Sequence, residues 1–446
     1  MQVRRRQPDR EVVVLEKGSF TSYSACGIPY VVGGLIDDVD DLVARTPEEF
    51  RAHDIDVRLG HEVRALDLDA GAVEAWDHAA GASVRVEYDQ LHLAMGAVPV
   101  RPPLPGLDLP FVHGVQNLDD ATRLLAGIEA GRSPGAGPSS GSGLKVVVIG
   151  GGYIGIEMAE SFVQRGAEVT VVEGSGQVMA ALDADIAGPL ADAMAKLGID
   201  VRLGTRVTSV EQADGGRGAV VAGDERFPAD LVVLGLGVRP NSRLAADAGI
   251  EIGVRDAIRV DRRQRTSAEA VWAAGDCCES FHVIARAPVH IALGTVANKQ
   301  GRVAGINLAG DYAAFAGVLG TAVSKVCHTE VGRSGLSERE AERYGFAYVS
   351  AKVEATSRAG YYPDAKPITL KCLAERGSRR LIGAQVIGHE GAAKRIDVLA
   401  TAMWAGMTVD DVVELDLGYA PPFGPVWDPV HHAARQLVRA LDDAPA

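Results

Sequence analysis

Short runs of β-branched residues alternate with helical patterns in the first part of the chain. Two of these runs, EVVVLE at residues 11–16 and KVVVIG at residues 145–150, are almost continuously apolar, which is typical of strands covered on both faces of a parallel sheet. The segment IEMAESFVQRG at residues 156–166 has helical periodicity, and another strand pattern follows at residues 168–172. The last three segments predict a βαβ unit, so we expect an α/β fold.

The pattern changes after Gly317. Before it, strand patterns at residues 230–236 and 270–274 and a helical pattern at about 291–308 continue the α/β alternation. After it come alternating apolar and polar segments, followed by two helical stretches; these segments are 322–332, 346–355, 368–375 and 381–388. Alternation of this kind predicts an antiparallel sheet, and we expect a C-terminal α+β domain in which helices back that sheet.

Length and composition fit a globular protein of several domains. The 446 residues exceed what one hydrophobic core usually serves, so we expect two or three domains. The glycine-, serine- and proline-rich segment at residues 131–143 predicts a linker or surface loop between two of them. No apolar run approaches the ~20 residues of a membrane span and no signal peptide opens the chain, so we expect a cytoplasmic protein that does not enter a membrane.

Charge and cysteine content exclude several classes of function. The formal charge of −14 argues against general nucleic-acid binding, which needs a basic surface. The five cysteines form no CxxC pair, so the sequence predicts neither a zinc site nor a disulfide framework, and no other metal site is expected. We expect all five to be reduced thiols.

A glycine-rich turn lies between the strand at residues 145–150 and the following helix. A GxGxxG pattern alone is weak evidence, but here it joins a strand to a helix, which is the arrangement that binds dinucleotides. We expect Gly150 to allow the tight turn, Gly152 to let the pyrophosphate approach the backbone, and Gly155 to let helix and strand pack closely. The sequence therefore predicts a nucleotide site at the start of this helix.

An acidic residue, Glu173, ends the next strand of this unit. A carboxylate there accepts hydrogen bonds from the ribose hydroxyls of NADH and repels the 2′-phosphate of NADPH. The residues that follow, Gly174 to Gly176, supply no arginine to neutralise that phosphate. We therefore expect NADH to be the preferred donor, with NADPH still possible.

One cysteine, Cys26, lies where the extended segment SYSACGIPY turns into a helix. Helix N-termini favour a thiolate over a thiol, so we expect Cys26 to be a reactive nucleophile. A nicotinamide transfers a hydride, whereas sulfur chemistry needs electrons delivered to an S–S bond, and a flavin is the cofactor that connects the two. The sequence therefore favours a flavin between the nucleotide site and Cys26.

Several short motifs together resemble the flavin-dependent pyridine nucleotide-disulfide oxidoreductases, most closely the single-cysteine coenzyme A-disulfide reductase and NADH oxidase branch. The resemblance runs from residue 2 to about residue 436 and rests on Cys26 in SYSACGIPY, the glycine loop at 150–155, AMGA at 94–97, LGVRPN at 236–241, AGD at 274–276 and YAPPF at 419–423.

This resemblance implies two Rossmann-like domains and a homodimer. The FAD domain would comprise residues 1–112 and 240–316, the NAD(P)H domain residues 113–239, and the dimerisation domain residues 317–446. The implied reaction is reduction of a small disulfide, coenzyme A disulfide above all, through a mixed disulfide with Cys26.

The resemblance also assigns individual residues. It implies FAD contacts from Glu16, Lys17, Val63, Ala94, Gly96 and Asp276. It adds Tyr153, Ile154 and Gly237 to the glycines and Glu173 of the NAD(P)H site. It places Tyr361 or Tyr362 and Tyr419 at the disulfide, with Tyr419 coming from the partner subunit, and it turns Gln2, Arg5 and Ser22 toward the ADP portion of coenzyme A.

Three departures from the family pattern leave alternatives open. Met95 stands where the family has threonine, and Ala25 stands where the family often has asparagine. Met1 lies within the helix that follows the family's FAD-binding glycine loop, so we expect either a late start codon or a true truncation. On the same scaffold, oxidation of the thiol to a sulfenic acid would make an NADH oxidase or peroxidase, and sulfane sulfur would make a polysulfide reductase. A dimer that binds nucleotide without flavin is a further alternative.

Overall fold

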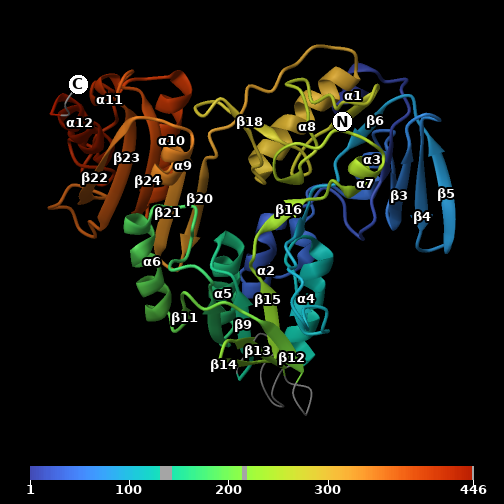
Figure 1. Cartoon of the computed structure of the whole chain (residues 1–446), viewed down its shortest axis with the longest axis horizontal. Helices are drawn as coiled ribbons and strands as arrows, with labels where there is room; N and C mark the ends of the chain where they lie inside the picture. The colour runs from blue at the N-terminus through green and yellow to red at the C-terminus, as the bar shows by residue number, and fades with distance from the viewer. Residues whose placement is uncertain (131–142, 213–217, 444–446) are drawn as a thin grey trace.

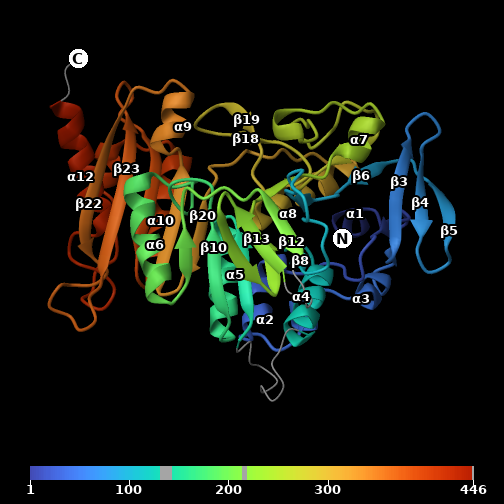
Figure 2. The same cartoon turned by 60° about the horizontal axis from the view of Figure 1, so that its bottom comes forward.

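The computed structural model describes residues 1–130, 143–212 and 218–443. The predicted linker at 131–143 lies, except for Gly143, outside these residues. Figure 1 shows the C-terminal domain on the left, the segments from the first part of the chain and from residues 240–316 on the upper right, and the βαβ unit below and between them. Figure 2 shows the same three parts from a direction turned by 60°.

The middle part is built on a five-stranded parallel sheet with the strand order β11-β10-β9-β15-β8. These strands are β8 (Val112–His113), β9 (Lys145–Ile149), β10 (Glu168–Val172), β11 (Asp200–Arg202) and β15 (Leu231–Leu234). Its helices are α4 (Leu118–Ala130), α5 (Tyr153–Gln164) and α6 (Ala184–Lys196). The predicted βαβ unit is confirmed, and the expected domain boundary between residues 112 and 113 falls inside β8.

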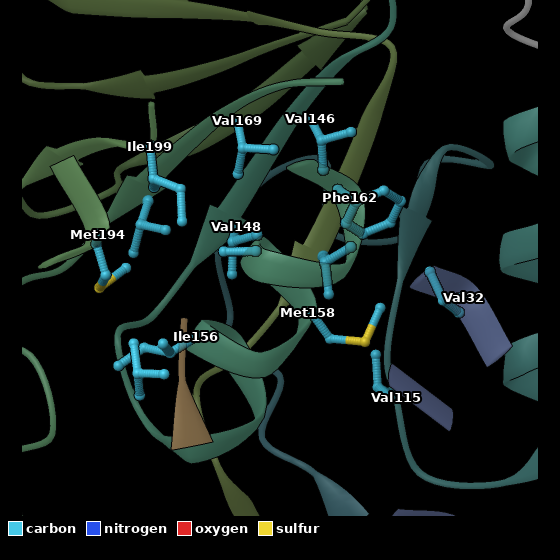
Figure 3. Close-up of a cluster of buried hydrophobic side chains, with 14 of the residues drawn as sticks. Val32, Val115, Val146, Val148, Ile156, Met158, Phe162, Val169, Met194 and Ile199 are labelled. Atoms are coloured by element: carbon cyan, nitrogen blue, oxygen red, sulfur yellow. The ribbon is translucent and has the colours of Figure 1, made fainter. Parts of the chain in front are cut away.

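A small antiparallel sheet of β12 (Ser209–Gln212), β13 (Gly218–Ala222) and β14 (Glu225–Ala229) completes this middle part. The core between the parallel sheet and its helices consists mainly of aliphatic side chains from β9, β10, α5 and α6, together with Phe162 of α5, as Figure 3 shows. The same core includes Val32, which belongs to α2 (Ile28–Gly33), the helix that follows Cys26. The position of α2 is therefore fixed by packing against the nucleotide-binding unit.

The first part of the chain contains two separate parallel strand pairs. One pair is β1 (Val13–Leu15) with β2 (Asp56–Arg58), and the other is β6 (Leu91–Leu93) with β17 (Val271–Ala273). Among the described residues no strand joins the two pairs. The predicted strands at 11–16 and 270–274 are both present, although each is shorter than its apolar run.

The other elements of this part are short, apart from one helix. A three-stranded antiparallel sheet consists of β3 (His61–Asp67), β4 (Ala72–Asp77) and β5 (Ala82–Glu87). The helices are α1 (Gln2–Arg6), η1 (Ala25–Gly27), η2 (Val39–Leu42), α3 (Pro47–Arg51), α7 (Arg243–Asp247), η3 (Val254–Asp256) and α8 (Gly294–Leu308). A hairpin of β18 (Ser280–His282) and β19 (Ala287–Val289) precedes α8.

Two of the sequence motifs pair directly. Strand β7 (Ala97–Pro99), from the AMGA motif, pairs antiparallel with β16 (Val238–Pro240), from the LGVRPN motif. Asn241 then clamps the turn before β7, because its backbone N–H donates to the Gly96 carbonyl oxygen over 3.0 Å and its side chain donates to the Met95 carbonyl oxygen over 3.2 Å. Met95, in place of the family's threonine, leaves this connection between the two nucleotide-binding regions intact.

The C-terminal domain is an antiparallel five-stranded sheet with the order β20-β21-β24-β23-β22, as the alternating pattern predicted. Its strands are β20 (Ala322–Val326), β21 (Thr329–Gly335), β22 (Tyr348–Thr356), β23 (Pro367–Glu375) and β24 (Leu381–Gly388). Its helices are α9 (Glu338–Arg343), α10 (Ala392–Ala405), α11 (Val409–Val413) and α12 (Pro429–Asp442).

One detail of this sheet was predicted wrongly. Residues 322–332 form two strands joined by a tight turn, in which Cys327 has a left-handed backbone with φ of 58°. The turn itself, at Cys327 and His328, carries no glycine or asparagine, the residues that usually mark such a turn, so the apolar alternation gave the pattern of one strand. Within the part of the chain that is described, no helix has the length and apolar character needed to cross a membrane.

Candidate functional site

The glycine loop owes its shape to close backbone contacts. A Cβ atom on Gly155 would lie 2.0 Å from the Gly150 carbonyl oxygen, and one on Gly150 would lie 2.5 Å from the Gly235 carbonyl oxygen. Gly150 also has φ of 107°, which side chains rarely allow. These two glycines are therefore required by the fold of the loop itself.

Gly152 differs from its two neighbours. The nearest atom to a Cβ there would be the Gly235 carbonyl oxygen at 3.7 Å, which is an ordinary contact, and its backbone is extended. The protein alone therefore does not require glycine at this position. Space left open over the backbone at the start of a helix is what a dinucleotide pyrophosphate needs, so Gly152 fits the role expected of it.

Glu173 lies at the end of β10 and faces this loop. Its Oε2 accepts a hydrogen bond from the Gly151 N–H over 2.7 Å, and its Oε1 accepts one from the Ser175 N–H over 2.7 Å. Each carboxylate oxygen has a second lone pair, so both can still accept a hydroxyl. The protein thus holds Glu173 in place before any ribose arrives.

The other predicted NAD(P)H residues surround the first turn of α5. Tyr153 and Ile154 begin this helix, which no side chain caps. The Tyr153 hydroxyl is buried and has no hydrogen-bond partner within the described ranges, and burial raises its pKa. Gly237 lies between β15 and β16 with φ of 82° and open space where a side chain would be. This arrangement leaves helix N–H groups and one hydroxyl available to a ligand.

The predicted flavin residues lie on the two separate strand pairs. Glu16 follows β1 and accepts a hydrogen bond from the Gly18 N–H over 2.7 Å. Asp276 follows β17, and its Oδ1 is buried without a partner among the described residues. Burial raises the pKa of Asp276, and the nearby His290 opposes this shift. A buried carboxylate oxygen without a partner fits a residue that contacts a hydroxyl-bearing ligand, so Glu16 and Asp276 fit FAD.

Sequence reasoning missed the residue that holds the Asp276 turn, which is Gln300 on α8. Its Oε1 accepts a hydrogen bond from the Gly275 N–H over 2.9 Å, and its Nε2 donates to the Glu279 carbonyl oxygen and to Ser280 Oγ. Gln300 is completely buried. A glutamine within an apolar helical face was the available signal.

The remaining predicted flavin residues are spread around these two. Lys17 follows Glu16 and is exposed, Ala94 is exposed after β6, and Gly96 has φ of 64° with open space beside it. Val63 lies on β3, where the strand register shifts. Among the described residues, no hydrogen bond or ion pair joins these four to Asp276, so their assignment stays a prediction.

Cys26 is the only exposed cysteine of the five, all of which are free thiols. It lies in the 3₁₀ turn η1 directly before α2, as expected for a helix start. Burial of part of the thiol raises the pKa of Cys26, and the negative charges of Glu157 and Asp276 raise it further, whereas a backbone hydrogen bond lowers it. Burial first and the two carboxylates second therefore oppose the thiolate expected at this helix start, and the reactivity of Cys26 stays a prediction.

Those two carboxylates show what the fold brings together at Cys26. Asp276 comes from the flavin side, and Glu157 comes from α5, one turn after the glycine loop. Glu157 accepts a hydrogen bond from Ser324 Oγ over 2.7 Å, so β20 of the C-terminal domain supports it, and burial raises the pKa of Glu157. Sequence reasoning missed Glu157, although it follows Gly155 by only two residues.

The three candidate tyrosines lie in the C-terminal domain. A hydrogen bond with Tyr419 raises the pKa of Tyr361, so these two phenols meet although they come from different loops. Tyr361 is 78% exposed and Tyr419 is 49% exposed. The loop between β22 and β23, which carries Tyr361 and Tyr362, lies at the left of Figures 1 and 2, whereas α2 lies in the middle. The fold does not bring the tyrosines to Cys26 of the same chain.

The residues predicted to bind substrate lie near the amino terminus. Arg4, Arg6 and Arg10 have carboxylate or carbonyl partners within the protein, whereas Arg5 is exposed. Gln2 accepts a hydrogen bond from Arg6 over 2.5 Å. Arg6 is exposed as well, so among the described residues Arg5 is the exposed arginine of the cluster whose side chain has neither a hydrogen bond nor an ion pair.

Ser22 leads to a second arginine that sequence reasoning missed. The Ser22 carbonyl oxygen accepts hydrogen bonds from the backbone N–H groups of Ala44 and Arg45. Burial lowers the pKa of the Met1 amino group, and the charges of Arg5 and Arg45 lower it further. Two arginines thus lie close to the same group, with Ser22 beside one of them.

Comparison with known proteins agrees with this geometry. The profile of the pyridine nucleotide-disulphide oxidoreductase family matches residues 2–301, and that of the family's dimerisation domain matches residues 321–429. An NAD(P)H coenzyme A polysulfide/persulfide reductase of Pyrococcus horikoshii is 38% identical over 437 residues, which cover 98% of this chain and 94% of the relative.

Two further comparisons extend this result. A coenzyme A disulfide reductase of Staphylococcus aureus is 28% identical and covers 95% of this chain and 92% of its own length. The solved structure of an NAD-dependent persulfide reductase from A. fulgidus superimposes with a TM-score of 0.92 at 37% identity, covering 99% of this chain and 80% of that chain.

Proposed function

This chain belongs to the pyridine nucleotide-disulphide oxidoreductases, and from that membership we propose that it uses NADH to reduce an S–S bond carried by coenzyme A, with Cys26 as the reacting thiol. The cofactors of this family are FAD and NAD(P)H. Coenzyme A disulfide is the proposed substrate, and the cytoplasm, where thiols stay reduced, is the proposed location.

The observation that carries the proposal is the position of Cys26. The thiol is exposed, and it lies close enough to Asp276 on the flavin side and to Glu157 on the nucleotide side for both charges to change its pKa. A thiol between the two cofactor regions and open to solvent can meet a substrate on one side and receive electrons on the other. The other four cysteines are buried.

The proposed chemistry is a thiol exchange followed by reduction. The Cys26 sulfur attacks one sulfur of coenzyme A disulfide, so that a Cys26–coenzyme A disulfide forms and one coenzyme A thiolate leaves and takes up a proton. Bound FAD would supply the two electrons that NADH provides. These electrons break the mixed disulfide, the second coenzyme A leaves as a thiol, and Cys26 returns to its starting state, with NADH and one proton consumed for two thiols released.

The raised pKa of Cys26 bears on the first step. The attacking species is the thiolate, and a raised pKa disfavours it, so the first step requires that the proton leave the Cys26 sulfur. The leaving thiolate in turn needs a donor, and a phenol can serve. The Tyr361–Tyr419 pair has the required hydroxyls, but the fold keeps it away from Cys26 of the same chain. We therefore assign this role to the partner subunit's copy of the pair.

A homodimer in which the pair reaches the partner is supported by the surface around it. Large apolar side chains are exposed in and next to the YAPPF motif, namely Phe423 at 78% and Val426 at 66%, together with Trp427. Soluble monomers rarely leave such a group uncovered. These residues also lie within the segment that matches the family's dimerisation domain.

The binding of coenzyme A is assigned to the basic amino-terminal surface. Arg5 is exposed, and the Arg45 backbone N–H donates a hydrogen bond to the Ser22 carbonyl oxygen. Guanidinium groups bind phosphates with two parallel hydrogen bonds, which suits the phosphates of the ADP portion. We add Arg45 to the predicted set of Gln2, Arg5 and Ser22.

A second substrate class is favoured by the comparison with the Pyrococcus enzyme, which acts on coenzyme A polysulfide or persulfide. The same exchange at Cys26 would release sulfide in place of a second coenzyme A thiol. The basic surface recognises the coenzyme A portion in either case, so only the sulfur-bearing end distinguishes the two substrates.

The experiment is a steady-state assay of the purified, FAD-loaded protein with NADH. Coenzyme A disulfide, coenzyme A persulfide, oxygen and peroxide are supplied in turn, and the release of thiol or sulfide, or the consumption of oxygen or peroxide, is measured. Cys26→Ser should lower the rate with the coenzyme A substrates by at least about a thousandfold while FAD and NADH still bind. Cys372→Ala is the control, because this buried thiol lies in the C-terminal core.

Each result of this assay has a defined meaning. Turnover of the disulfide by wild type and the control, but not by Cys26→Ser, supports the proposal. Turnover of oxygen or peroxide alone would make the chain an NADH oxidase or peroxidase, and full activity of Cys26→Ser would remove the mechanism. A protein that binds NADH but takes up no FAD would leave only nucleotide binding.

A further inference from the structure

Four polar side chains form a row across one face of the C-terminal sheet. Arg333 on β21 is directly paired with Gln385 on β24, Gln385 with Lys371 on β23, and Lys371 with Lys352 on β22. Residues directly paired across strands lie on the same face, so the row crosses four neighbouring strands of the sheet. We call these residues the cross-strand row.

The cross-strand row meets one short segment of the nucleotide-binding part, residues 181–185. Arg333 donates to the Ala181 carbonyl oxygen over 2.7 Å. Gln385 accepts from the Asp183 N–H and donates to the Asp183 carboxylate, each over 2.7 Å. Both of these hydrogen bonds of the Gln385 amide therefore go to Asp183, the residue before α6.

The two lysines bind the acidic groups of the same segment. The Lys371 ammonium lies 3.2 Å from Asp183 and 2.8 Å from Asp185, and it also lies 2.8 Å from Glu338 of α9. Lys352 adds a contact of 3.5 Å to Asp185. Burial alone would lower the pKa of Lys371, but its bonds to carboxylates outweigh that effect and raise it.

Burial makes these contacts specific. Lys371 is 5% exposed and Gln385 is 1% exposed. Polar groups this deeply buried cannot exchange their partners for water, so losing one leaves another unsatisfied. The segment 181–185 is thus held to the sheet in one position.

This segment is the far end of the loop that begins at Glu173. Hydrogen bonds connect the two ends, because the Ser175 N–H donates to Glu173, Ser175 Oγ donates to the Gln177 carbonyl oxygen over 2.7 Å, and the Gln177 side chain donates to the Leu182 carbonyl oxygen over 3.0 Å. Met179 of the same loop donates its N–H to the Gly151 carbonyl oxygen over 2.7 Å. The loop therefore touches the glycine turn at its middle and the cross-strand row at its end.

We propose that the cross-strand row is a positioning device of the C-terminal domain for the adenosine half of NADH. It fixes residues 181–185, and through the loop it holds Glu173 and the glycine turn in the geometry that the ribose and pyrophosphate need. The inference rests on the proposed NADH site and goes beyond it, because it makes nucleotide affinity depend on side chains of the C-terminal domain.

The test uses Gln385→Met in the full-length, FAD-loaded protein. Methionine keeps the volume of glutamine but removes both bonds to Asp183. The NADH dissociation constant, measured by NADH fluorescence, should rise about threefold to tenfold, and KM for NADH should rise with it, whereas kcat stays within about twofold. Reduced nicotinamide mononucleotide lacks the adenosine half, so its kinetics should not change.

Two more variants keep the test decisive. Lys352→Met removes one half-exposed contact of the cross-strand row and should raise the NADH dissociation constant by about twofold. This variant takes the place of Gln385→Met if the latter does not fold. Arg379→Met is the matched control, because it removes ion pairs to Asp410 and Asp442 within the same domain and touches nothing in residues 181–185.

The outcomes separate the inference from the proposed function. Unchanged NADH affinity in a folded Gln385→Met protein would overturn the inference, as would an equal loss with reduced nicotinamide mononucleotide or an equal loss in the Arg379→Met control. A wild-type protein that does not bind NADH would overturn the proposed function itself.

Discussion

The two nucleotide-binding regions of this chain use the same local device in different surroundings. Glu16 and Glu173 each end a parallel strand, and each accepts a hydrogen bond of 2.7 Å from the N–H two residues later. Glu173 in addition accepts from Gly151 of the glycine loop, within a continuous five-stranded sheet. On the flavin side the strands form two separate pairs, and the Asp276 carboxylate keeps one buried oxygen without a partner among the described residues.

From this difference we infer that the protein alone positions the Glu173 carboxylate, whereas the Asp276 carboxylate depends on a ligand. A carboxylate already bonded at both oxygens changes little when a ribose binds. A buried carboxylate without a partner is unfavourable until a donor arrives. We therefore expect substitutions on the NADH side to change nucleotide binding by changing the shape of the loop. Substitutions on the FAD side should change flavin binding by removing the carboxylate that the ligand pairs with.

The largest expected effect is that of Gly155→Ala on stability and NADH affinity, compared with Gly152→Ala in the same loop. Gly155→Ala places a Cβ 2.0 Å from the Gly150 carbonyl oxygen, so the loop must move, and we expect a loss of about 1–3 kcal/mol in the free energy of unfolding and more than about a hundredfold in NADH affinity. Gly152→Ala fits the protein, so it should weaken NADH binding and leave stability unchanged. Urea unfolding and NADH fluorescence titration measure both, and equal destabilisation by the two variants would refute the distinction.

The next effect concerns the flavin side. Asp276→Asn removes the charge from a carboxylate assigned to FAD, and the loss of a charge-assisted hydrogen bond should weaken FAD binding by about tenfold to a hundredfold. Flavin fluorescence titration of the FAD-depleted protein gives the dissociation constant. Unchanged FAD affinity would remove Asp276 from the site.

The same residue predicts a pH dependence of the FAD-depleted protein. Burial raises the pKa of Asp276 above its usual value of 3.8, so the folded state binds its proton more tightly than the unfolded state does. The free energy of unfolding should therefore fall as pH rises from about 4 through the raised pKa. Asp276→Asn should lack this fall, and an identical pH profile for variant and wild type would contradict the assignment.

A smaller effect tests the choice of nucleotide. Glu173→Gln keeps the side-chain shape and one of the two backbone hydrogen bonds, and it removes the charge that opposes a 2′-phosphate, so the ratio of kcat/KM for NADPH to that for NADH should rise about tenfold. Steady-state kinetics with the two nucleotides measure this ratio. A wild-type preference for NADPH would show that the ribose assignment is wrong.

The smallest expected effect is a change in the rate at which Cys26 is alkylated. Because partial burial and the charges of Glu157 and Asp276 raise its pKa above the usual value near 9, its alkylation by iodoacetamide should keep accelerating up to about pH 9. Glu157→Gln should speed alkylation about threefold at neutral pH. Glu160→Gln, one turn further along α5, is the control, and a rate that levels off below pH 8 would contradict the raised pKa.

Sequence patterns predicted the parts of the molecule that are set locally. The βαβ unit, the three loop glycines and Glu173 lie within 29 consecutive residues, 145–173, where strand, turn and helix patterns follow one another directly. The position of Cys26 at a helix start was predicted for the same reason. Its raised pKa was not, because Glu157 and Asp276 reach it only through the fold.

The parts that depend on strand register or on contacts between distant segments could not be predicted from the sequence. The cross-strand row combines Arg333, Lys352, Lys371 and Gln385, which become neighbours only when four strands pair in one register. The turn at Cys327 was missed because it lacks the usual turn residues. Gln300 gave no signal beyond being a polar residue in an apolar helical face.

The most direct test of the central claim, that Cys26 is the thiol that exchanges with coenzyme A, needs neither flavin nor turnover. The reduced protein is incubated with coenzyme A disulfide without NADH, and peptides are mapped by mass spectrometry. We predict one coenzyme A adduct per chain, on the peptide that carries Cys26 and absent from Cys26→Ser. An adduct on Cys277, Cys278, Cys327 or Cys372 in place of Cys26, or no adduct at all, would contradict the account.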